Sequence, residues 1–361
     1  MKFSIVVINH NYGRYLAQAI ETALAQPVSD LEVVVVDDGS SDDSRKIIES
    51  FGARIVAVYQ TQGGHVCAVN AGYAACAGEG IVFLDADDFL YPNVLKAAEA
   101  LFEPGCAKIQ FRLDTVDEAG RDQAAPFPYF PEDLSPQEIL RQSLEFGVYP
   151  WTVSSGNVFF RSFMEQVMPI DVNRIYRSPD GYLNKMAPLY GKVKTSRDVV
   201  GAYRVHGSNT WASAGQSLRS YPANRWVAFD RVLCDTFNAR ASALGYTPRS
   251  YDNLISLQRI EHRLMGLRAD PEAYPIPGDT KRSLFMLGLR TARLAPNVSA
   301  TGRAFWTIWL AALAFAPFWV IDTLHKNTRS QGERPALARL LVKFARGPAT
   351  LRRSASARSN H

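Results

Sequence analysis

The residues Leu31–Asp42 read LEVVVVDDGSSD and change character abruptly in the middle. The first half, Leu31–Val36, contains four consecutive valines, and β-branched side chains favour a β-strand. Because it is apolar almost throughout, this run is typical of a parallel strand that is covered on both faces. The second half contains acids, glycine and serines, which favour a turn. The stretch therefore predicts a buried parallel strand that ends in a polar loop.

The flanking sequence repeats this pattern. Three further apolar runs have the length of a strand: Phe3–Ile8, Ile55–Val58 and Ile81–Leu84. Helical patterns fall between the runs: an apolar face from Tyr15 to Leu24, then Ser44–Phe51 and Val66–Ala77. Strands that alternate with helices predict an α/β fold, with a mainly parallel mixed sheet that is flanked by helices.

The rest of the chain is less regular. Residues 114–136 contain four prolines and several acids, and we expect them to form a long surface loop. Regular structure is expected again at 137–146, 158–160, 180–190, 192–195 and 199–205. Residues 216–268 have a mostly helical pattern.

Polar clusters follow three of the predicted strands. They are Asn9-His10-Asn11, Asp37-Asp38-Gly39-Ser40-Ser41 and Asp85-Ala86-Asp87-Asp88. Ligands of an open parallel sheet bind beyond the carboxyl ends of its strands, so these clusters are expected to meet at one edge. The acids of two clusters would repel one another unless a cation lay between them, and carboxylate oxygens suit Mg²⁺ or Mn²⁺. The alternative is that both clusters are ordinary acidic turns.

Two common nucleotide-binding patterns are absent. A dinucleotide site needs the glycine pattern GxGxxG after the first strand, whereas this chain has His10-Asn11-Tyr12-Gly13 there. The P-loop pattern is also missing. A nucleoside diphosphate held through a divalent cation therefore fits the acidic edge better than a dinucleotide.

Charge is distributed unevenly along the chain. Residues 281–361 hold 14 Lys and Arg against 2 Asp and Glu, a net charge of +12. Since the whole chain carries +5, the first 280 residues carry −7. Such asymmetry indicates an anionic partner for the basic part, either nucleic acid or a membrane surface, or else a solvated basic tail.

The apolar residues of this basic part favour lipid and argue against nucleic acid. Phe305–Ile321 is uncharged over 17 residues and contains three tryptophans. Leu337, Leu340, Leu341 and Phe344 follow at helical spacing, opposite Arg339, Lys343 and Arg346. A basic amphipathic helix is typical of an element that lies on a membrane. We expect 305–321 to lie in the membrane surface, with a single span as the alternative, because the run is short for a span and contains Pro317.

The cysteines and the N-terminus bear on the compartment. The four cysteines form no CxxC pair and suit neither a zinc site nor a disulfide framework. The first residues lack a secretion signal, since the apolar run Phe3–Ile8 is short. We expect a cytoplasmic protein that is peripheral on the inner face of the membrane.

Seven short motifs occur in order within the first 210 residues. They are SIVVINHNYGRYL (Ser4–Leu16), VDDGSSD (Val36–Asp42), GGHVCAVNAGY (Gly63–Tyr73), FLDADD (Phe83–Asp88), SGNVFF (Ser155–Phe160), PDGYL (Pro179–Leu183) and YRVHGSN (Tyr203–Asn209). Together they resemble a family 2 glycosyltransferase of the GT-A type. The resemblance implies the nucleotide-diphospho-sugar transferase fold, and it is specific for the family but not for a sugar.

The resemblance also implies a nucleotide site. Asp38 would accept a hydrogen bond from the base, and Asn9, His10 and Asn11 would line the same pocket. Asp85 would meet the ribose or a metal-bound water. Gly64 would let the backbone approach the diphosphate, unless it only forms a tight turn.

By the same resemblance, Asp87 would bind the metal ion. His206 matches a position that reaches the metal or the diphosphate in some relatives. Asp180 matches the catalytic base of a single displacement with inversion. Read without the resemblance, Asp180 is an ordinary helix cap and His206 an ordinary hydrogen-bonding group. Two positions depart from the family: His10 replaces the usual Tyr, and Val69 replaces an Arg that is common before Asn70.

These inferences define the expected protein. A catalytic domain would span residues 1–215, a helical extension 216–300, and a membrane-associating segment 301–361. The activity would be transfer of a sugar, from a UDP-sugar by default, to the hydroxyl of a lipid-linked or saccharide acceptor in envelope, exopolysaccharide or glycolipid synthesis. The alternatives are a sugar nucleotidyltransferase and a non-catalytic protein that binds sugar nucleotides or serves in assembly.

Overall fold

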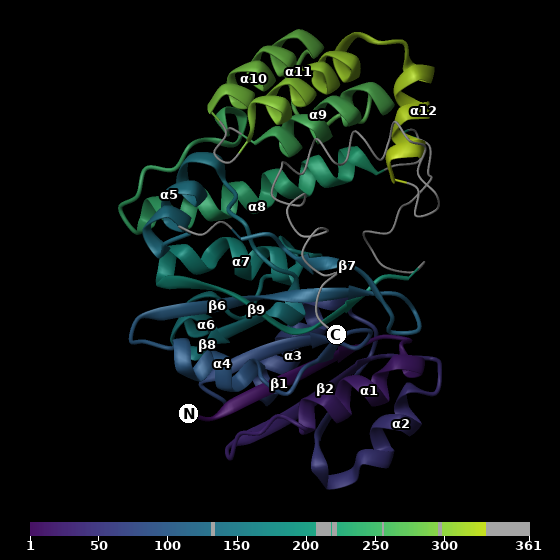
Figure 1. Ribbon diagram of the computed structural model, residues 1–361, viewed down its shortest axis with the longest axis vertical. Coiled ribbons are helices and arrows are strands. Elements are labelled where there is room, and N and C mark those ends of the chain that lie inside the picture. The colour runs from purple at the N-terminus through teal and green to yellow at the C-terminus, as the bar shows by residue number, and fades with distance from the viewer. Residues whose placement is uncertain (131–133, 207–217, 219–221, 255, 295–297, 330–361) are drawn as a thin grey trace, which may run out of the picture. The chain divides into compact units, whose positions relative to one another are not determined.

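The computed structural model describes residues 1–130, 134–206, 218, 222–254, 256–294 and 298–329 (Figure 1). The strands are β1 (Phe3–Asn9), β2 (Leu31–Asp38), β3 (Val56–Gln60), β4 (Gly80–Asp85), β5 (Phe89–Leu90), β6 (Cys106–Val116), β7 (Asp122–Phe127), β8 (Asn157–Phe160) and β9 (Lys192–Arg204). The helices are α1 (Gly13–Leu24), α2 (Ser44–Phe51), α3 (His65–Ala75), α4 (Val94–Leu101), α5 (Pro136–Phe146), α6 (Arg161–Val167), α7 (Pro179–Tyr190), α8 (Ala223–Ala243), α9 (Leu257–Ala269), α10 (Lys281–Leu294), α11 (Ala300–Phe315) and α12 (Phe318–Arg329).

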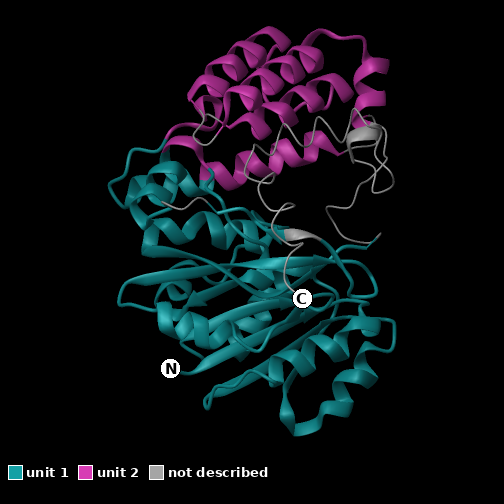
Figure 2. Ribbon diagram, in the orientation of Figure 1, with its two compact units in different colours: residues 1–144, 148–209, 236–248 teal, residues 145–147, 210–235, 249–361 magenta. Residues whose placement is uncertain are grey.

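The chain divides into two compact units, which Figure 2 shows in separate colours. Unit 1 comprises residues 1–144, 148–209 and 236–248 and contains the sheet. Unit 2 comprises residues 145–147, 210–235 and 249–361, and its described part is helical. The predicted boundaries at 215/216 and 300/301 stay predictions. α8 contributes residues to both units.

The sheet of unit 1 is mixed, with its parallel part at the start of the chain. Its strand order is β3-β2-β1-β4-β8-β6-β9-β5, and β7 pairs with β6. β1, β2, β3 and β4 are parallel, as the alternation of strands and helices predicted. Register aligns Asn9 with Asp37, and Ile8 with Asp85. The three polar clusters that follow these strands therefore lie at one edge of the sheet.

Helices cover both faces of the parallel part of this sheet, which explains why β1, β4 and the middle of β2 are apolar and buried. On β1, alternate residues Phe3, Ile5 and Val7 pack in one core together with side chains of α1, α2 and α4. The residue between them, Val6, points to the other face. There it lies against Gly72 of α3, where a Cβ atom would be 2.3 Å from a Val6 methyl carbon.

The prediction of a long loop over residues 114–136 is wrong. Residues 106–127 contain an antiparallel hairpin of β6 and β7, with Leu113 paired to Phe127. β7 contains Pro126 and pairs only with β6 among the described strands. An edge strand tolerates proline because one row of its N–H groups needs no partner. The two strands expected at 192–195 and 199–205 are likewise one strand, β9.

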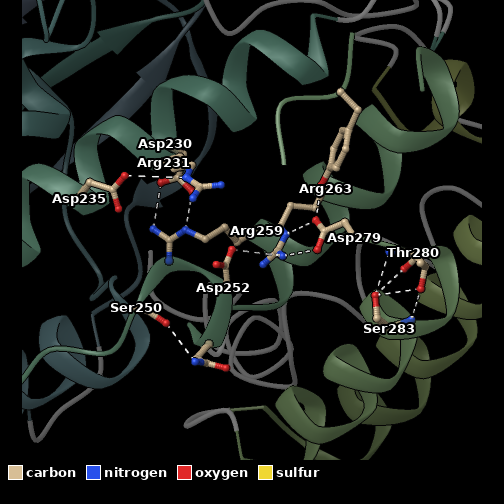
Figure 3. A network of polar contacts seen from close by, with 12 residues as sticks. Asp230, Arg231, Asp235, Ser250, Asp252, Arg259, Arg263, Asp279, Thr280 and Ser283 are labelled. Atoms are coloured by element: carbon tan, nitrogen blue, oxygen red, sulfur yellow. Dashed lines mark hydrogen bonds and ion pairs between the residues drawn. The ribbon is translucent and has the colours of Figure 1, made fainter. Parts of the chain in front are cut away.

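Unit 2 has its own apolar core and a buried polar network. Helices α9, α10 and α11 lie side by side around Ile260, Leu284 and Leu310 (Figure 1). Figure 3 shows Arg259 bonded to both oxygens of Asp230, and Arg263 bonded to Asp279. Both arginines are buried, so their pairing with carboxylates removes the cost of an isolated buried charge.

The apolar run 305–321 is divided between two helices. α11 ends at Phe315, and α12 begins at Phe318 after Pro317, which lacks the N–H that a continuing helix would need. In the part of the chain that the structure describes, no helix has the length and apolar character that crossing a membrane requires. The amphipathic pattern predicted around 337–346 lies outside the described residues.

Candidate active site

Asp38 organises the loop at the end of β2. Its Oδ1 accepts hydrogen bonds from the Gly63 amide at 2.7 Å and from the Gln60 side chain at 2.6 Å. Its Oδ2 accepts a bond from the Gly64 amide at 2.8 Å. Gly64 has φ of +87°, a conformation that favours glycine, and it directly precedes α3. Asp38 therefore joins the end of β2 to the start of α3.

The three residues after β1 build the neighbouring loop. Asn9 is fully buried and donates to Asp37 at 2.9 Å and to Ser40 at 3.0 Å. His10 Nδ1 lies 2.8 Å from the Asp38 carbonyl oxygen, so this nitrogen carries the proton. Asn11 accepts a bond from the Ser41 amide at 2.8 Å and has a left-handed φ of +59°. These contacts order the loop after β1, and the roles of Asn9, His10 and Asn11 toward a nucleotide stay predictions.

The acidic cluster after β4 is crowded with negative charge. The pKa of Asp85 is raised to about 7, by burial and by the charges of Asp87 and Asp180, against the lowering effect of His65. The pKa of Asp88 is also raised, by burial and by the charges of Asp87 and Asp85. Carboxyl groups with such pKa values keep their charge poorly without a cation nearby.

His206 contacts both the acidic cluster after β4 and two tyrosines that follow β1. Its Nε2 is 2.9 Å from Asp87 Oδ2, and both side chains are buried. The rings of Tyr12 and Tyr15 lie 5.5 Å and 5.7 Å from the imidazole, measured between centroids. The fold thus joins two candidate metal ligands that are separated by 119 residues in the sequence.

The chemistry of these side chains suits a divalent cation, although they do not enclose one alone. Carboxylate and imidazole groups are ligands of Mn²⁺ and Mg²⁺. No group of three or more His, Cys, Asp or Glu side chains is arranged to hold a metal ion among the residues that the structure describes. Asp87 and His206 would therefore need oxygen ligands from the substrate to complete a coordination shell.

Asp180 lies in the first turn of α7 and is half-buried. The Ser178 hydroxyl donates to Asp180 Oδ1 at 2.8 Å. Ser178 has a left-handed φ of +50°, a conformation that costs a serine about 1 kcal/mol or more and is often found at functional sites. Asp180 is close enough to the acidic cluster for its charge to raise the pKa of Asp85.

Three further residues of the site were not singled out from the sequence. His65 Nε2 lies 3.5 Å from Asp85, and the Ser155 hydroxyl donates to Asp88 at 2.6 Å. Arg204 donates to the Asp87 carbonyl oxygen at 2.8 Å and stacks on the Tyr15 ring. All three lie inside the motifs quoted above, so their presence in those motifs was the available signal.

A mixed sheet whose parallel strands end in polar loops at one edge, with helices on both faces, is typical of the GT-A glycosyltransferase fold. Structural comparison confirms this fold. S. aureus TarS, residues 1–349 in complex with UDP, superposes with a TM-score of 0.52 and 15% identity over 92% of this chain and 91% of that one. Another structure of S. aureus TarS gives a TM-score of 0.52 and 15% identity over 92% of this chain and 55% of that one.

The chain belongs to glycosyl transferase family 2. The family's sequence model matches residues 4–167. An uncharacterized glycosyltransferase of Nostoc sp. is 36% identical over 231 residues, which cover 62% of this chain and 70% of that protein. Chondroitin synthase of Escherichia coli is 36% identical over 216 residues, which are 57% of this chain but only 29% of the synthase. The family predicted from the seven motifs is thereby confirmed.

Proposed function

We propose that this glycosyltransferase moves a hexose-type sugar from a nucleoside diphosphate, UDP by default, to an acceptor hydroxyl with inversion at the anomeric carbon. The observation that carries the proposal is the meeting of Asp87 and His206 beside the Asp38 loop, in a chain of this family. The default of UDP rests on the family resemblance, and His10 and Val69 are the positions where donor recognition departs from it.

In the proposed reaction Asp180 acts as the general base. The acceptor oxygen attacks the anomeric carbon while the bond from that carbon to the diphosphate oxygen breaks. Asp180 takes the proton of the acceptor hydroxyl, and the nucleoside diphosphate leaves with the bonding electron pair. The half-buried position of Asp180 at the start of α7 supports this role, because the carboxylate is held by Ser178 yet remains accessible.

Asp87 and His206 are the residues that would hold a divalent cation, Mn²⁺ or Mg²⁺, together with oxygens of the donor diphosphate. When bound, the cation would offset the negative charge that develops on the departing diphosphate. The raised pKa of Asp85 supports this part of the proposal, since a nearby cation would stabilise its charged form. Asp38 and the Gly64 amide would shape the base and diphosphate ends of the pocket.

We extend the proposal to an acceptor at an anionic membrane, with lipid-linked or saccharide acceptors of envelope, exopolysaccharide or glycolipid synthesis as the candidates. Apolar side chains stand exposed on three helices of unit 2: Met286 on α10, Ile308 and Phe315 on α11, and Trp319 on α12. Trp319 is 72% exposed and Ile308 is 70% exposed. The rings of Phe285 and Phe315 are in contact, which brings α10 and α11 together.

Exposed arginines accompany these apolar side chains. They are Arg282, Arg290 and Arg293 on α10 and Arg303 on α11. Apolar side chains beside basic ones match the two components of an anionic leaflet, its acyl region and its headgroups. The proposed location is therefore peripheral, on the inner face of the membrane.

Vesicle flotation tests the membrane proposal. The full chain is expected to float with phosphatidylglycerol vesicles and less with phosphatidylcholine vesicles, and the double variant Ile308→Asp/Trp319→Asp is expected to stay at the bottom. Leu244→Asp serves as the matched control, since Leu244 is an exposed leucine of unit 1. Equal flotation of the double variant and the control would contradict docking through these helices.

The transfer proposal is tested by nucleotide release from a panel of nucleotide sugars, with Mn²⁺, Mg²⁺ or EDTA and with a membrane lipid extract as acceptor. Metal-dependent release from one donor is expected, and Asp180→Asn should lose turnover while it keeps UDP binding. Unchanged release in Asp180→Asn would refute the role of the base. If no nucleotide binds at all, the transfer proposal fails and the non-catalytic assembly role is the alternative that remains. Pyrophosphate release from a nucleoside triphosphate would indicate the nucleotidyltransferase.

A further inference from the structure

Lys108 of β6 is a fully buried lysine in unit 1. Its Nζ donates to the Gln110 side-chain oxygen at 2.9 Å and to the side-chain oxygen of Asn184. The rings of Tyr149 and Phe159 lie within 6 Å of the same nitrogen, at 5.4 Å and 5.9 Å. A lysine is rarely buried without a carboxylate partner, and here both hydrogen-bond acceptors are neutral amides. Burial of an amine without a carboxylate partner lowers the stability of the fold, so we expect such an arrangement where it serves function.

The residue that Lys108 reaches, Asn184, anchors helix α7. Asn184 is fully buried, and its side-chain nitrogen donates to the Thr152 carbonyl oxygen at 3.0 Å. Its own carbonyl oxygen accepts a bond from the Tyr149 hydroxyl at 2.7 Å. With the bond from Lys108, three contacts fix this turn of α7 to β6 and to the segment 149–152.

Asp180 lies four residues before Asn184 in the same helix, one turn away on the same side. A change in the rotation or translation of α7 at Asn184 would therefore move the Asp180 carboxylate. The link is also electrostatic, because the charge of Asp180 raises the pKa of Lys108 against the larger lowering effect of burial. Among the described contacts, Lys108 makes no direct bond to Asp180. Its link to the proposed base runs through Asn184 and through the electrostatic effect.

We propose that Lys108 is a positioning residue for the transfer reaction, which acts through Asn184 to hold α7 so that Asp180 meets the acceptor hydroxyl. The inference rests on the proposed role of Asp180 as the base. It assigns Lys108 an effect on the chemical step and none on donor binding, since the donor loops lie at the ends of β1, β2 and β4.

Steady-state kinetics of Lys108→Met provide the test, with the donor that the nucleotide-sugar panel identifies and membrane lipid extract as acceptor. A displacement of about 1 Å in a catalytic group can cost about 100-fold in rate, so kcat is expected to fall about 10- to 100-fold. The donor KM and the Kd of UDP are expected to stay within about twofold. Unchanged kcat, or a rise in KM alone, would overturn the proposal.

Lys185→Met is the matched control. Lys185 is a buried lysine of the same helix, and its Nζ lies 5.1 Å from the Phe237 ring, whereas the Lys108 nitrogen lies near the rings of Tyr149 and Phe159. This variant is expected to lower thermal stability without the selective loss of kcat. If both lysine variants reduce kcat equally, Lys108 has only a structural role.

Asn184→Ala removes the α7 partner of the bond between Lys108 and Asn184. It replaces Lys108→Met in the kinetic test if Lys108→Met does not fold. The double variant is expected to be no slower than Asn184→Ala alone, because both changes remove one interaction. Multiplicative losses would contradict the link. Hydrogen exchange at residues 180–184 should also become faster in either single variant, with or without donor, and unchanged exchange would refute the anchoring.

Asp180→Asn separates this inference from the function on which it rests. If Asp180→Asn keeps full turnover, the proposed base is wrong. If Asp180→Asn loses turnover while Lys108→Met keeps it, the base stands and only the positioning role fails.

Discussion

Asp38 binds the site together through hydrogen bonds that use both oxygens of one carboxylate. Its partners are the amides of Gly63 and Gly64 and the side chain of Gln60. Bonds to an ionised acceptor are stronger than neutral ones. The residue therefore sets the path of the chain from β3 to α3, and any contact that it makes with a nucleotide base depends on this order.

Replacement of Asp38 by Asn should destabilise this loop. The side-chain NH2 of asparagine would face the N–H of Gly63 or Gly64, so two donors would meet without an acceptor at a buried side chain, which costs about 1–3 kcal/mol. Urea unfolding is expected to report this loss, and isothermal titration should show weaker UDP binding. Asp43→Asn is the control, because Asp43 is 75% exposed and pairs only with Lys46 among the described contacts. Equal stability of both variants would argue against the role of Asp38 in the loop.

Lys108 predicts a dependence of stability on pH. Burial lowers its pKa well below the ordinary 10.5. Between the lowered and the ordinary pKa, the unfolded chain binds a proton that the folded chain has released. The free energy of unfolding therefore rises with pH across this window and levels off above about 10.5.

The difference in unfolding free energy between the wild type and Lys108→Met isolates this effect. It is expected to grow in favour of the wild type as pH rises from about 7 to about 10, measured by urea unfolding at each pH. A difference that is constant with pH would show that the pKa of Lys108 is the same in the folded and unfolded chains.

At the scale of elements, close packing of α3 on β1 positions the first turn of α3, which belongs to the proposed donor site. Gly72 is the contact point, because a Cβ atom there would come within 2.3 Å of a Val6 methyl carbon. Val6 is fully buried and β-branched, so it has little freedom to move away. The helix is thus held against the sheet at a fixed distance, with Gly64 and His65 at its first turn.

Gly72→Ala should therefore be destabilising although alanine favours helices. Overpacking of a close-packed contact costs about 1–3 kcal/mol, which exceeds the gain of about 1 kcal/mol in helix propensity. Thermal unfolding is expected to show a lower Tm. Ala74→Ser changes an exposed position of the same helix and should have little effect. A Tm that increases in Gly72→Ala would mean that α3 shifts freely on the sheet.

At the scale of the whole molecule, each of the two units has its own core and its own polar network. In unit 2, Arg259 bonds to Asp230 and donates to the Phe146 carbonyl oxygen at 3.0 Å. Asp230 is 30% exposed whereas the Arg259 side chain is only 7% exposed. Removal of the arginine leaves a partly buried carboxylate and a buried carbonyl group without this partner.

Arg259→Met is expected to destabilise unit 2 by about 3 kcal/mol, near the lower end for a broken buried ion pair because Asp230 keeps some contact with water. Hydrogen exchange should become faster in α9 while β1 and β4 of unit 1 keep their protection. The double variant Arg259→Met/Asp230→Leu removes both charges and is expected to recover most of the loss. Uniformly faster exchange in both units would show that they unfold as one.

Local pattern was sufficient for a large part of this architecture. Runs such as Leu31–Val36 predict strands because consecutive β-branched residues favour extended backbone, and alternation with helices implies parallel pairing. Parallel strands end at one edge, so the meeting of Asn9, Asp38 and Asp85 followed without knowledge of a structure. The hairpin of β6 and β7 was missed because Pro126 and the prolines that follow it indicate a loop, and only an edge position in the sheet makes Pro126 compatible with a strand.

The sequence by itself determined the family, the order of the first strands and helices, and the side chains that meet at the edge of the sheet. Only the tertiary structure placed His206 beside Asp87, and Lys108 against Asn184, across 119 and 76 residues respectively. The physical reason is that strand and helix preferences arise from neighbouring residues, whereas such contacts depend on how distant elements pack. The supports of the site therefore became visible in the fold, while its acids could be read from the sequence.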